Sequence, residues 1–303
     1  KEDKRRNAGF SVFYMGINLG AFIAPLICGP LAQRVDWHWG FGAAGIGMTF
    51  GVIQYMFGKR YLVGSEAPRT DSSQAREDHT SKQVEAPPLT KTDRNRIVVI
   101  FILFVFATMF WAAFEQAGSS LNLFADRLTD LNMFGTDVPS STFQSIQPMF
   151  VIILSPVFAL LWLRMGSKEP SSPAKFMLGL IFVGIGLLLL VPASGMAQSG
   201  GVKVSPWWLV GVYFFHTVGE LCLSPVGLSM VTKLAPARIV GLMMGVWFLS
   251  ISLGNKLGGF TAGFFERLPL PTLFGAVAAT TIVAGLILAV LIKPIRRLMG
   301  GVH

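Results

Sequence analysis

Charged residues are scarce in this sequence. Asp, Glu, Lys and Arg make up only 14% of the 303 residues, whereas 52% are hydrophobic, and the mean hydropathy is +0.58. A soluble domain is usually about a quarter charged. The composition therefore excludes both an ordinary soluble enzyme and a disordered chain.

Cysteines are few and catalytic motifs are missing. Cys28 and Cys222 both lie in apolar stretches, which predicts small buried side chains without a disulfide framework or a metal site. The sequence has no H-E-x-x-H, no G-x-S-x-G and no Walker loop, which are the motifs of common hydrolases and nucleotide-driven pumps. Residues 40–45 fit G-x-G-x-x-G, but no strand precedes them, as a dinucleotide site requires. We therefore expect no enzyme activity, no cofactor and no metal.

Long apolar stretches are what the sequence does contain. A helix that crosses a bilayer needs roughly 20 mainly apolar residues, and stretches of about this length recur along the whole chain. The sequence therefore predicts an all-α polytopic membrane protein with eight spans, at 10–32, 39–57, 97–123, 144–163, 176–193, 206–231, 239–263 and 270–292.

The basic residues are distributed unevenly between the two sides of these spans. The N-terminal stub and every second connection hold 20 of the 25 Lys and Arg residues, the other connections hold 4, and Lys256 lies within a span. Cytoplasmic loops carry such an excess. The distribution therefore predicts that both termini and residues 59–96 are cytoplasmic. The net charge of +9 then reflects topology and attraction to membrane lipid, and it needs no nucleic acid as partner.

Residues 59–96 lack apolar periodicity and are rich in Ser, Asp, Glu, Lys and Pro, which is typical of a solvated linker. This linker leaves two spans before it and six after it, whereas transporter halves often contain six helices each. The chain also starts at Lys1 with a basic stretch that resembles a cytoplasmic loop. We therefore expect residues 1–58 to be the last two helices of an N-terminal six-helix bundle and 97–303 to be the C-terminal six-helix bundle, in a chain that lacks four N-terminal helices.

Glu220 is the strongest functional candidate, because it lies deep within an apolar span. An ionised side chain at mid-bilayer costs roughly 2.5–3.5 kcal/mol on insertion scales and is a functional candidate by default. A carboxylate that either a proton or a ligand ammonium can neutralise links these two binding events, as proton symport requires. His216 and Ser224, four residues before and after it, share its helix face. The alternatives are a structural pair for Glu220 and a packed histidine at 216.

Glu115 is the second buried acid of interest. It lies within the stretch from Phe110 to Asn122, in which Gln116, Ser119 and Asn122 form much of one polar stripe. A polar stripe on an apolar helix is expected to face a cavity or a neighbouring helix. A purely structural role as interhelical hydrogen-bonding residues remains the alternative.

Several neutral residues extend this polar pattern. Tyr14 and Asn18 lie on one face of the first span, and Gln147 is near the start of the fourth. Amide side chains can read a peptide backbone, because they both donate and accept hydrogen bonds, but they can equally bond a neighbouring helix. Trp247 could line a pocket or simply pack in the bundle.

These motifs together resemble the proton-dependent oligopeptide transporter family within the major facilitator superfamily. Residues 13–20 resemble the family's fifth-helix signature, 39–45 the start of its sixth helix, 110–116 its seventh helix, and 219–236 its tenth. The resemblance implies that the eight predicted spans are helices five to twelve of a twelve-helix fold.

The resemblance also implies roles for single residues. It implies that Glu220 binds the amino terminus of a peptide and takes part in proton coupling, and that Glu115 belongs to the coupling network. The substrate pocket is expected to contain Tyr14, Asn18, Gln147, Glu220, Ser224 and Trp247. Family members commonly have asparagine where this chain has Gln147, so the substrate preference is open. The E-x-x-E-R motif of the family's first helix and the lysine of its fourth have no counterpart in the sequence.

The sequence therefore predicts the C-terminal two-thirds of a proton-coupled symporter of a bacterial-type inner membrane. Its expected partners are di- and tripeptides, protons, lipid and the four remaining helices of the same polypeptide. Three alternatives stay open. They are a related carrier of nitrate, amino acids or another small solute, a membrane protein that binds without transporting, and an intramembrane enzyme.

Overall fold

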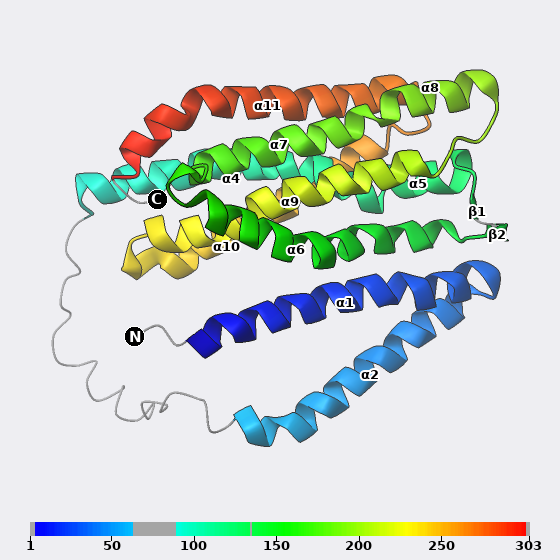
Figure 1. The fold of residues 1–303 in the computed structure, drawn as a ribbon, viewed down its shortest axis with the longest axis horizontal. Coiled ribbons are helices and arrows are strands. Elements are labelled where there is room, and N and C mark those ends of the chain that lie inside the picture. The colour runs from blue at the N-terminus through cyan, green and yellow to red at the C-terminus, as the bar shows by residue number, and fades with distance from the viewer. Residues whose placement is uncertain (1–3, 63–88, 134, 301–303) are drawn as a thin grey trace.

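The computed structural model describes residues 4–62, 89–133 and 135–300, with the backbone alone described for 4–14, 60–62 and 133. These residues fold almost entirely into helices, which are drawn in Figure 1. The elements are α1 (Lys4–Arg34), α2 (Trp37–Leu62), α4 (Lys91–Phe114), η2 (Glu115–Gly118), α5 (Ser120–Leu128), β1 (Asn132–Met133), β2 (Thr136–Asp137), η3 (Ser140–Ser145), α6 (Ile146–Met165), η4 (Gly166–Lys168), α7 (Ser172–Leu188), α8 (Leu190–Gly200), α9 (Trp207–Leu234), η5 (Ala237–Ile239), α10 (Val240–Ala262) and α11 (Leu270–Leu298).

All eight predicted spans coincide with helices, and the all-α membrane architecture is confirmed. Seven helical segments in the described part of the chain are long and apolar enough to cross a membrane. The helix outside this set is α2, which has 26 residues and covers the predicted span 39–57. Its glycines, together with Gln54 and Tyr55, lower its hydropathy. Two helix ends extend into the expected linker 59–96, because α2 continues to Leu62 and α4 begins at Lys91. Residues 63–88 lie outside the described part.

Local side-chain bonds fix where two of the helices begin. At α4, the Thr90 hydroxyl accepts a hydrogen bond from the Asp93 N–H at 3.1 Å, and the Asp93 carboxylate accepts one from the Thr90 N–H at 3.0 Å, which forms a capping box. At α2, the Asp36 carboxylate accepts the His38 N–H at 2.8 Å. This backbone bond, with a second one from the His38 ring, holds the pKa of Asp36 below its usual value.

Two predicted spans are interrupted helices. The span 97–123 was expected to be one helix, but α4 ends at Phe114 and continues through the 3₁₀ turn η2 into α5. Ser119, at the junction with α5, has φ −124° and ψ −93°, which is outside the α region. In the span 176–193, α7 passes into α8 at Leu189. Short 3₁₀ stretches such as η2 commonly interrupt helices. The interruption at η2 changes which side chains share a face with Glu115.

Helices α4–α11 form one bundle, and α1 and α2 form a hairpin beside it (Figure 1). Within the bundle, α7 packs extensively on α9 and α11, and α4 packs on α10. The hairpin contacts the bundle through α1, which packs on α6 and η3. Fully buried aromatic rings, including Phe110, Phe124 and Phe274, fill the bundle interior.

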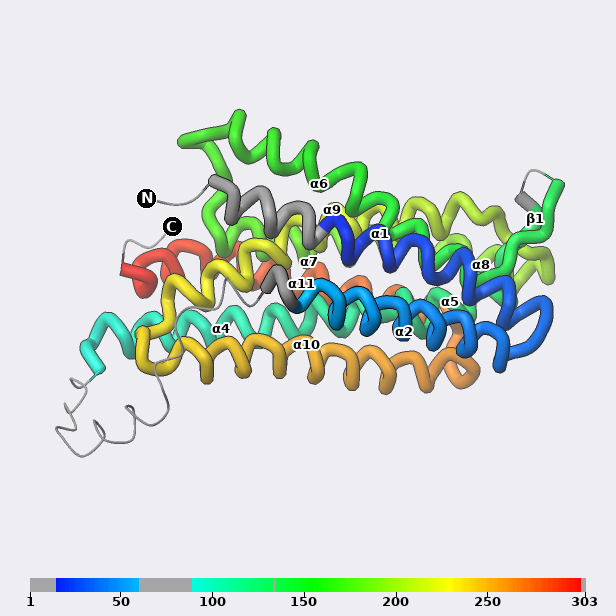
Figure 2. Tube along the Cα trace, turned by 90° about the horizontal axis from the view of Figure 1, so that it is seen from below, coloured from blue at the N-terminus to red at the C-terminus, as the bar shows by residue number. Residues whose placement is uncertain are grey.

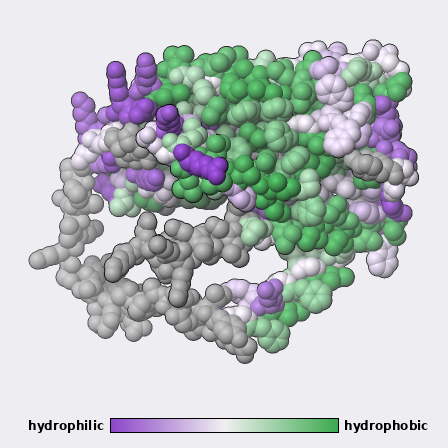
Figure 3. Space-filling view, in the orientation of Figure 1, coloured by the Kyte–Doolittle hydropathy of each residue, from purple (hydrophilic) through white to green (hydrophobic). Residues whose placement is uncertain are grey.

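The outer surface of the bundle is apolar, as a lipid-facing surface should be. Many large apolar side chains are exposed on it, including Leu163 at 79% and Val290 at 77%. Exposing so many apolar side chains to water would be costly. Figure 3 shows a broad apolar band with polar residues gathered at its two ends. The chain is therefore an integral membrane protein.

The two ends of the bundle differ in charge. We call one of them the basic end, because the helix ends there carry Lys91, Arg164, Lys175, Lys233 and Arg296. The start of α1 and the end of α11 lie at this end (Figure 1). The opposite end contains the junction of α1 and α2, the β1–β2 hairpin and η3, and it includes the acids Asp36, Asp126, Asp130, Asp137 and Glu266.

Candidate functional site

The predicted acid Glu220 contacts the predicted amide Gln147 directly. Glu220 lies near the middle of α9 and Gln147 lies in the first turn of α6, 73 positions earlier in the sequence. The Gln147 Nε2 donates a hydrogen bond to the Glu220 Oε2 at 2.5 Å, and both side chains are half-buried. An amide N–H that donates to a carboxylate favours the ionised carboxylate. The structure thus places a carboxylate, held by one neutral donor, between two membrane helices.

Neighbouring residues of α9 support this pair. The Thr217 hydroxyl lies 2.8 Å from the Tyr213 carbonyl and 3.5 Å from the Gln147 carbonyl. Gln147 therefore contacts α9 through both its side-chain amide and its backbone carbonyl. The sequence patterns did not predict Thr217 as a site residue, although Thr217 precedes Glu220 by three residues and shares its helix face. His216 is fully buried, and its ring stacks on Phe114 with 5.7 Å between centroids. This agrees with only half of the alternative of a packed, hydrogen-bonded histidine, because neither ring nitrogen has a hydrogen-bond partner among the residues that the structure describes.

Glu115 lies at the point where α4 passes into η2, and it is half-buried. The next residue, Gln116, has a different task. It is 2% exposed, and its Nε2 donates to the Thr261 hydroxyl at 2.6 Å and to the Gly258 carbonyl at 3.2 Å, both on α10. Because η2 breaks the predicted stripe, Gln116 joins η2 to α10, whereas Glu115 does not share this contact.

Asn18 reaches α6 from the other side. It is half-buried on α1 and lines a cavity of about 290 Å³ together with Val151, Ser155 and other residues of α6. Asn18 therefore lies beside α6, the helix that carries Gln147 one turn before Val151. The predicted residue Tyr14 is in α1, but its side chain lies outside the described part of the structure.

Ser224 and Trp247 are buried nearby in the bundle. The Ser224 hydroxyl has no hydrogen-bond partner among the residues that the structure describes. Trp247 is 5% exposed and packs on α9 at Gly227, where a Cβ atom would come within 2.2 Å of the indole ring. It also meets Phe176 edge-on at 6.0 Å. In this conformation Trp247 is a packing residue, as one of the two sequence interpretations had it.

The chemistry available to this cluster is the binding and release of cations. Glu220 can accept a proton, the amide of Gln147 or an ammonium group, and these three compete for the same oxygen atoms. The described residues contain no group of three His, Cys, Asp or Glu side chains that could hold a metal ion. Two acids and an amide within apolar helices are typical of a transport pathway for ions or small solutes.

Comparison with known proteins identifies the family. A sequence profile described as the POT family matches residues 1–74 and 65–278. The chain belongs to the POT family. The resemblance inferred from the motifs at 13–20, 110–116 and 219–236 is thereby confirmed.

Relatives of this POT-family chain are peptide transporters. The peptide transporter YePEPT of Yersinia enterocolitica is 37% identical over 98% of this chain and 70% of its own length. The di-/tripeptide transporter of Lactococcus lactis is 31% identical over 100% of this chain and 71% of its own length. A crystal structure of a mutant peptide transporter POT in complex with alafosfalin matches with a TM-score of 0.84 and 36% identity, over 99% of this chain and 70% of that one. The POT-family fold is therefore established, and the chain spans about 70% of these relatives.

Proposed function

We propose that this chain is part of a proton-coupled symporter that imports di- and tripeptides by alternating access. The observation that carries the proposal is the contact between Gln147 and Glu220, because it places a neutralisable carboxylate between two membrane helices of a peptide-transporter family. The relative from Lactococcus lactis is named a di-/tripeptide transporter, which supports the substrate class.

Glu220 is the residue at which peptide and proton meet in this proposal. The ammonium group of a peptide competes with the Gln147 amide for the Glu220 carboxylate. A proton on Glu220 removes the charge that holds the ammonium group, so protonation of Glu220 favours release of the peptide inside the cell. Glu115, which lies half-buried at the junction of α4 and η2, is assigned to the proton-coupling network. Asn18 and Gln147 are assigned to the peptide backbone, and Tyr14, Ser224 and Trp247 to the rest of the pocket.

The proposed arrangement in the membrane follows the charges. The basic end faces the cytoplasm of a bacterial-type inner membrane, so both termini are cytoplasmic. In this scheme α1 and α2 belong to one six-helix half and α4–α11 to the other, and residues 59–96 contain the cytoplasmic linker. Four further helices of the same polypeptide complete the first half, which the roughly 70% coverage of the relatives supports. Access alternates when one half rocks against the other.

Uptake into proteoliposomes tests the substrate class. The full-length protein should accumulate labelled dialanine when the outside is acidic and lose this accumulation when an uncoupler removes the proton gradient. Unlabelled dialanine and trialanine should compete, whereas nitrate and free alanine at the same concentration should not. Competition by nitrate or alanine alone would instead support the related carriers, and binding that does not depend on pH would support a non-transporting protein.

Replacing Gln147 tests its part in substrate binding. The change Gln147→Leu removes the donor to Glu220 and an amide for the peptide, so the half-saturating dialanine concentration should rise about 5- to 10-fold, as for the loss of one hydrogen bond. Gln147→Asn, which keeps the amide on a shorter side chain, should shift the preference between dialanine and trialanine with a smaller loss. Gln144→Leu is the matched control, because Gln144 donates to the Ala117 carbonyl at 2.7 Å instead. Equal effects at positions 144 and 147 would contradict the assignment.

A further inference from the structure

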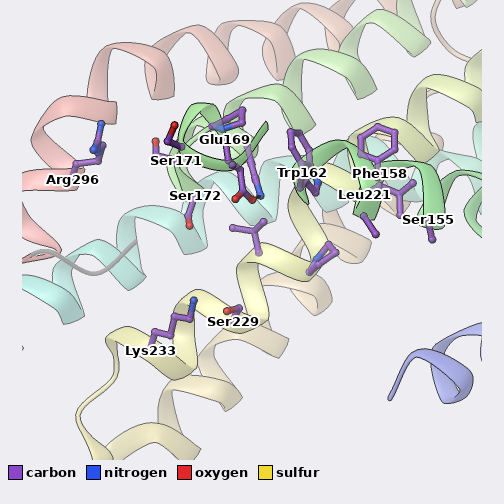
Figure 4. A pocket seen from close by; sticks show the side chains of 17 residues that line it. Ser155, Phe158, Trp162, Glu169, Ser171, Ser172, Leu221, Ser229, Lys233 and Arg296 are labelled. Atoms are coloured by element: carbon purple, nitrogen blue, oxygen red, sulfur yellow. Dashed lines mark hydrogen bonds and ion pairs between the residues drawn. The ribbon is translucent and has the colours of Figure 1, made fainter. Parts of the chain in front are cut away.

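A second cavity lies at the basic end, away from the contact between Gln147 and Glu220. Its volume is about 890 Å³, and Figure 4 shows side chains from α6, α7, α9 and the end of α11 around it. Its described lining combines charged, hydroxyl and apolar side chains. We call it the basic cavity. The proposed transport chemistry does not use it.

The basic cavity carries a positive charge that is partly fixed in place. Its described lining contains three cations, Lys175, Lys233 and Arg296, and one carboxylate, Glu169, which gives a formal charge of +2. Lys175 is 7% exposed, donates to Glu169, and has its Nζ 4.4 Å from the centre of the Trp162 ring. A cation held over an aromatic face and against a carboxylate has little freedom to move. Lys233 and Arg296 are exposed, at the last turns of α9 and α11.

The start of α7 adds further donors to this wall. Ser171 and Ser172 both line the cavity, and Ser171 precedes a helix of 17 residues without capping it through its side chain. The first N–H groups of a helix have no partner within the helix, and the helix dipole places partial positive charge there. In α7 these donors are the N–H groups of Ser172 and Ala174, because Pro173 between them has none. This arrangement of N–H groups, hydroxyl groups and cations favours an anion with several oxygen atoms, such as a phosphate ester.

Part of the lining of the basic cavity is apolar. This apolar wall contains Phe158 and Trp162 of α6 and Leu221, Pro225 and Val226 of α9. It adjoins the charged part of the lining, because the Trp162 ring also contacts Lys175. Figure 2 shows that α6 diverges from the bundle toward its Met165 end, where the cavity lies. This end of α6 belongs to a segment that is long and apolar enough to cross a membrane. A cavity at such a helix end, with both apolar and cationic lining, suits a ligand that has an apolar chain and an anionic headgroup.

We propose that the basic cavity binds an anionic phospholipid, with its phosphate against Arg296, Lys233 and the start of α7, and its acyl chain along Phe158 and Val226. A free phosphate ion fits the charged wall equally well, but it leaves the apolar wall without a ligand, whereas a phospholipid satisfies both. A basic cavity between membrane helices on the cytoplasmic side is a common lipid headgroup site. This binding concerns neither peptide nor proton, but it rests on the cytoplasmic orientation proposed for the basic end. The basic cavity adjoins the cavity that Asn18 lines, since both contain Ser155 and Ala159.

Trp162 provides a direct probe of occupancy. The full-length protein is placed in micelles with phosphatidylcholine and titrated with brominated phosphatidylglycerol or brominated phosphatidylcholine, since bromine on an acyl chain quenches a tryptophan that it touches. Brominated phosphatidylglycerol should quench at about fivefold lower mole fraction than brominated phosphatidylcholine, as expected for about one surface cation. Trp162→Phe keeps an aromatic face for Lys175, and it should remove the difference between the two lipids, although six other tryptophans remain in the chain.

Matched charge variants test the headgroup contact. Arg296→Ala should weaken quenching by phosphatidylglycerol about fivefold. Arg297→Ala should leave it within about twofold, because the exposed neighbour Arg297 is outside the lining. Native mass spectrometry of the same variants should show the same order in retained phosphatidylglycerol, which guards against a folding defect in one variant.

Four results would overturn the proposal. Equal quenching by both lipids would exclude selectivity for the anionic headgroup, and equal losses at 296 and 297 would indicate general surface charge. Displacement by millimolar inorganic phosphate would identify a site for a free anion. Displacement by dialanine would make the cavity part of the peptide route. Because the measurement involves no transport, its failure leaves the proposed function untouched.

Discussion

Replacing Glu220 with glutamine is expected to abolish proton-driven accumulation of dialanine by the full-length protein. Glutamine has nearly the same shape as glutamate and can still bond Gln147, but it can neither carry a negative charge nor take up a proton in this pH range. Loss of a hydrogen bond to a charged group costs about 1.5–3 kcal/mol, which weakens dialanine binding about 10- to 150-fold. Uptake against an acidic outside and dialanine binding are the two measurements.

The control and the contradicting result are equally specific. Glu266→Gln changes an exposed glutamate at the opposite end, which pairs with Arg127 at 2.7 Å, and a surface pair of this kind contributes about 0–1 kcal/mol. This variant should therefore transport normally. Normal proton-driven uptake by Glu220→Gln would exclude Glu220 from coupling. Loss of uptake with intact dialanine exchange across the membrane would assign Glu220 to the proton alone.

Sequence patterns captured the membrane helices because the bilayer imposes one length and one polarity on each of them. They failed where local geometry departs from a continuous helix. The stripe from Glu115 to Asn122 was read with a helical period, but η2 turns Gln116 toward α10, where it bonds Thr261. Composition does not report such a break, since the interrupted span 97–123 stays apolar throughout.

The candidate site shows a similar division. The depth of Glu220 in an apolar span was sufficient to select it, and the amide of Gln147 was selected for its chemistry. That these two residues touch could not be read from the sequence, because 73 positions separate them and helix packing decides which faces meet. Trp247 illustrates the opposite case, since only the packing on Gly227 shows that its ring is enclosed in this conformation.

The contacts between α1 and the bundle are concentrated at the end opposite the basic end. The Ser145 hydroxyl donates to the Phe22 carbonyl at 2.7 Å, and Gln33 donates to the Ser140 hydroxyl at 2.8 Å. Gly29 lies so close to η3 that a Cβ atom there would be 2.8 Å from the Ser141 Cβ. If α1 belongs to one rocking half and η3 to the other, these contacts must separate in every transport cycle.

A disulfide at this contact is therefore expected to stop transport completely. In a background with Cys28→Ser and Cys222→Ser, the changes Gly29→Cys and Ser141→Cys place two thiols where their Cβ atoms need move apart by only about 1 Å to reach disulfide geometry. Oxidation should reduce dialanine uptake to the level of empty liposomes, and a reducing agent should restore it. The single variants Gly29→Cys and Ser141→Cys, which cannot form this disulfide, show how much each substitution alone changes dialanine uptake.

A second disulfide on the same helix separates loss of motion from general damage. A Cβ atom at Gly40 would lie 2.7 Å from the Ala32 Cβ, so Ala32→Cys with Gly40→Cys joins α1 to α2, which move together in the proposed scheme. A Cβ atom at Gly40 would also lie 2.9 Å from the Cys28 carbonyl oxygen, so the extent of cross-linking must be measured for both pairs. Once formed, the cross-link between α1 and α2 should leave uptake unchanged. If the Gly29–Ser141 cross-link also left uptake unchanged, α1 and η3 could not belong to halves that separate, and the proposed division of the chain would be wrong. If both cross-links stopped uptake, motion within the α1–α2 hairpin would itself be part of the cycle.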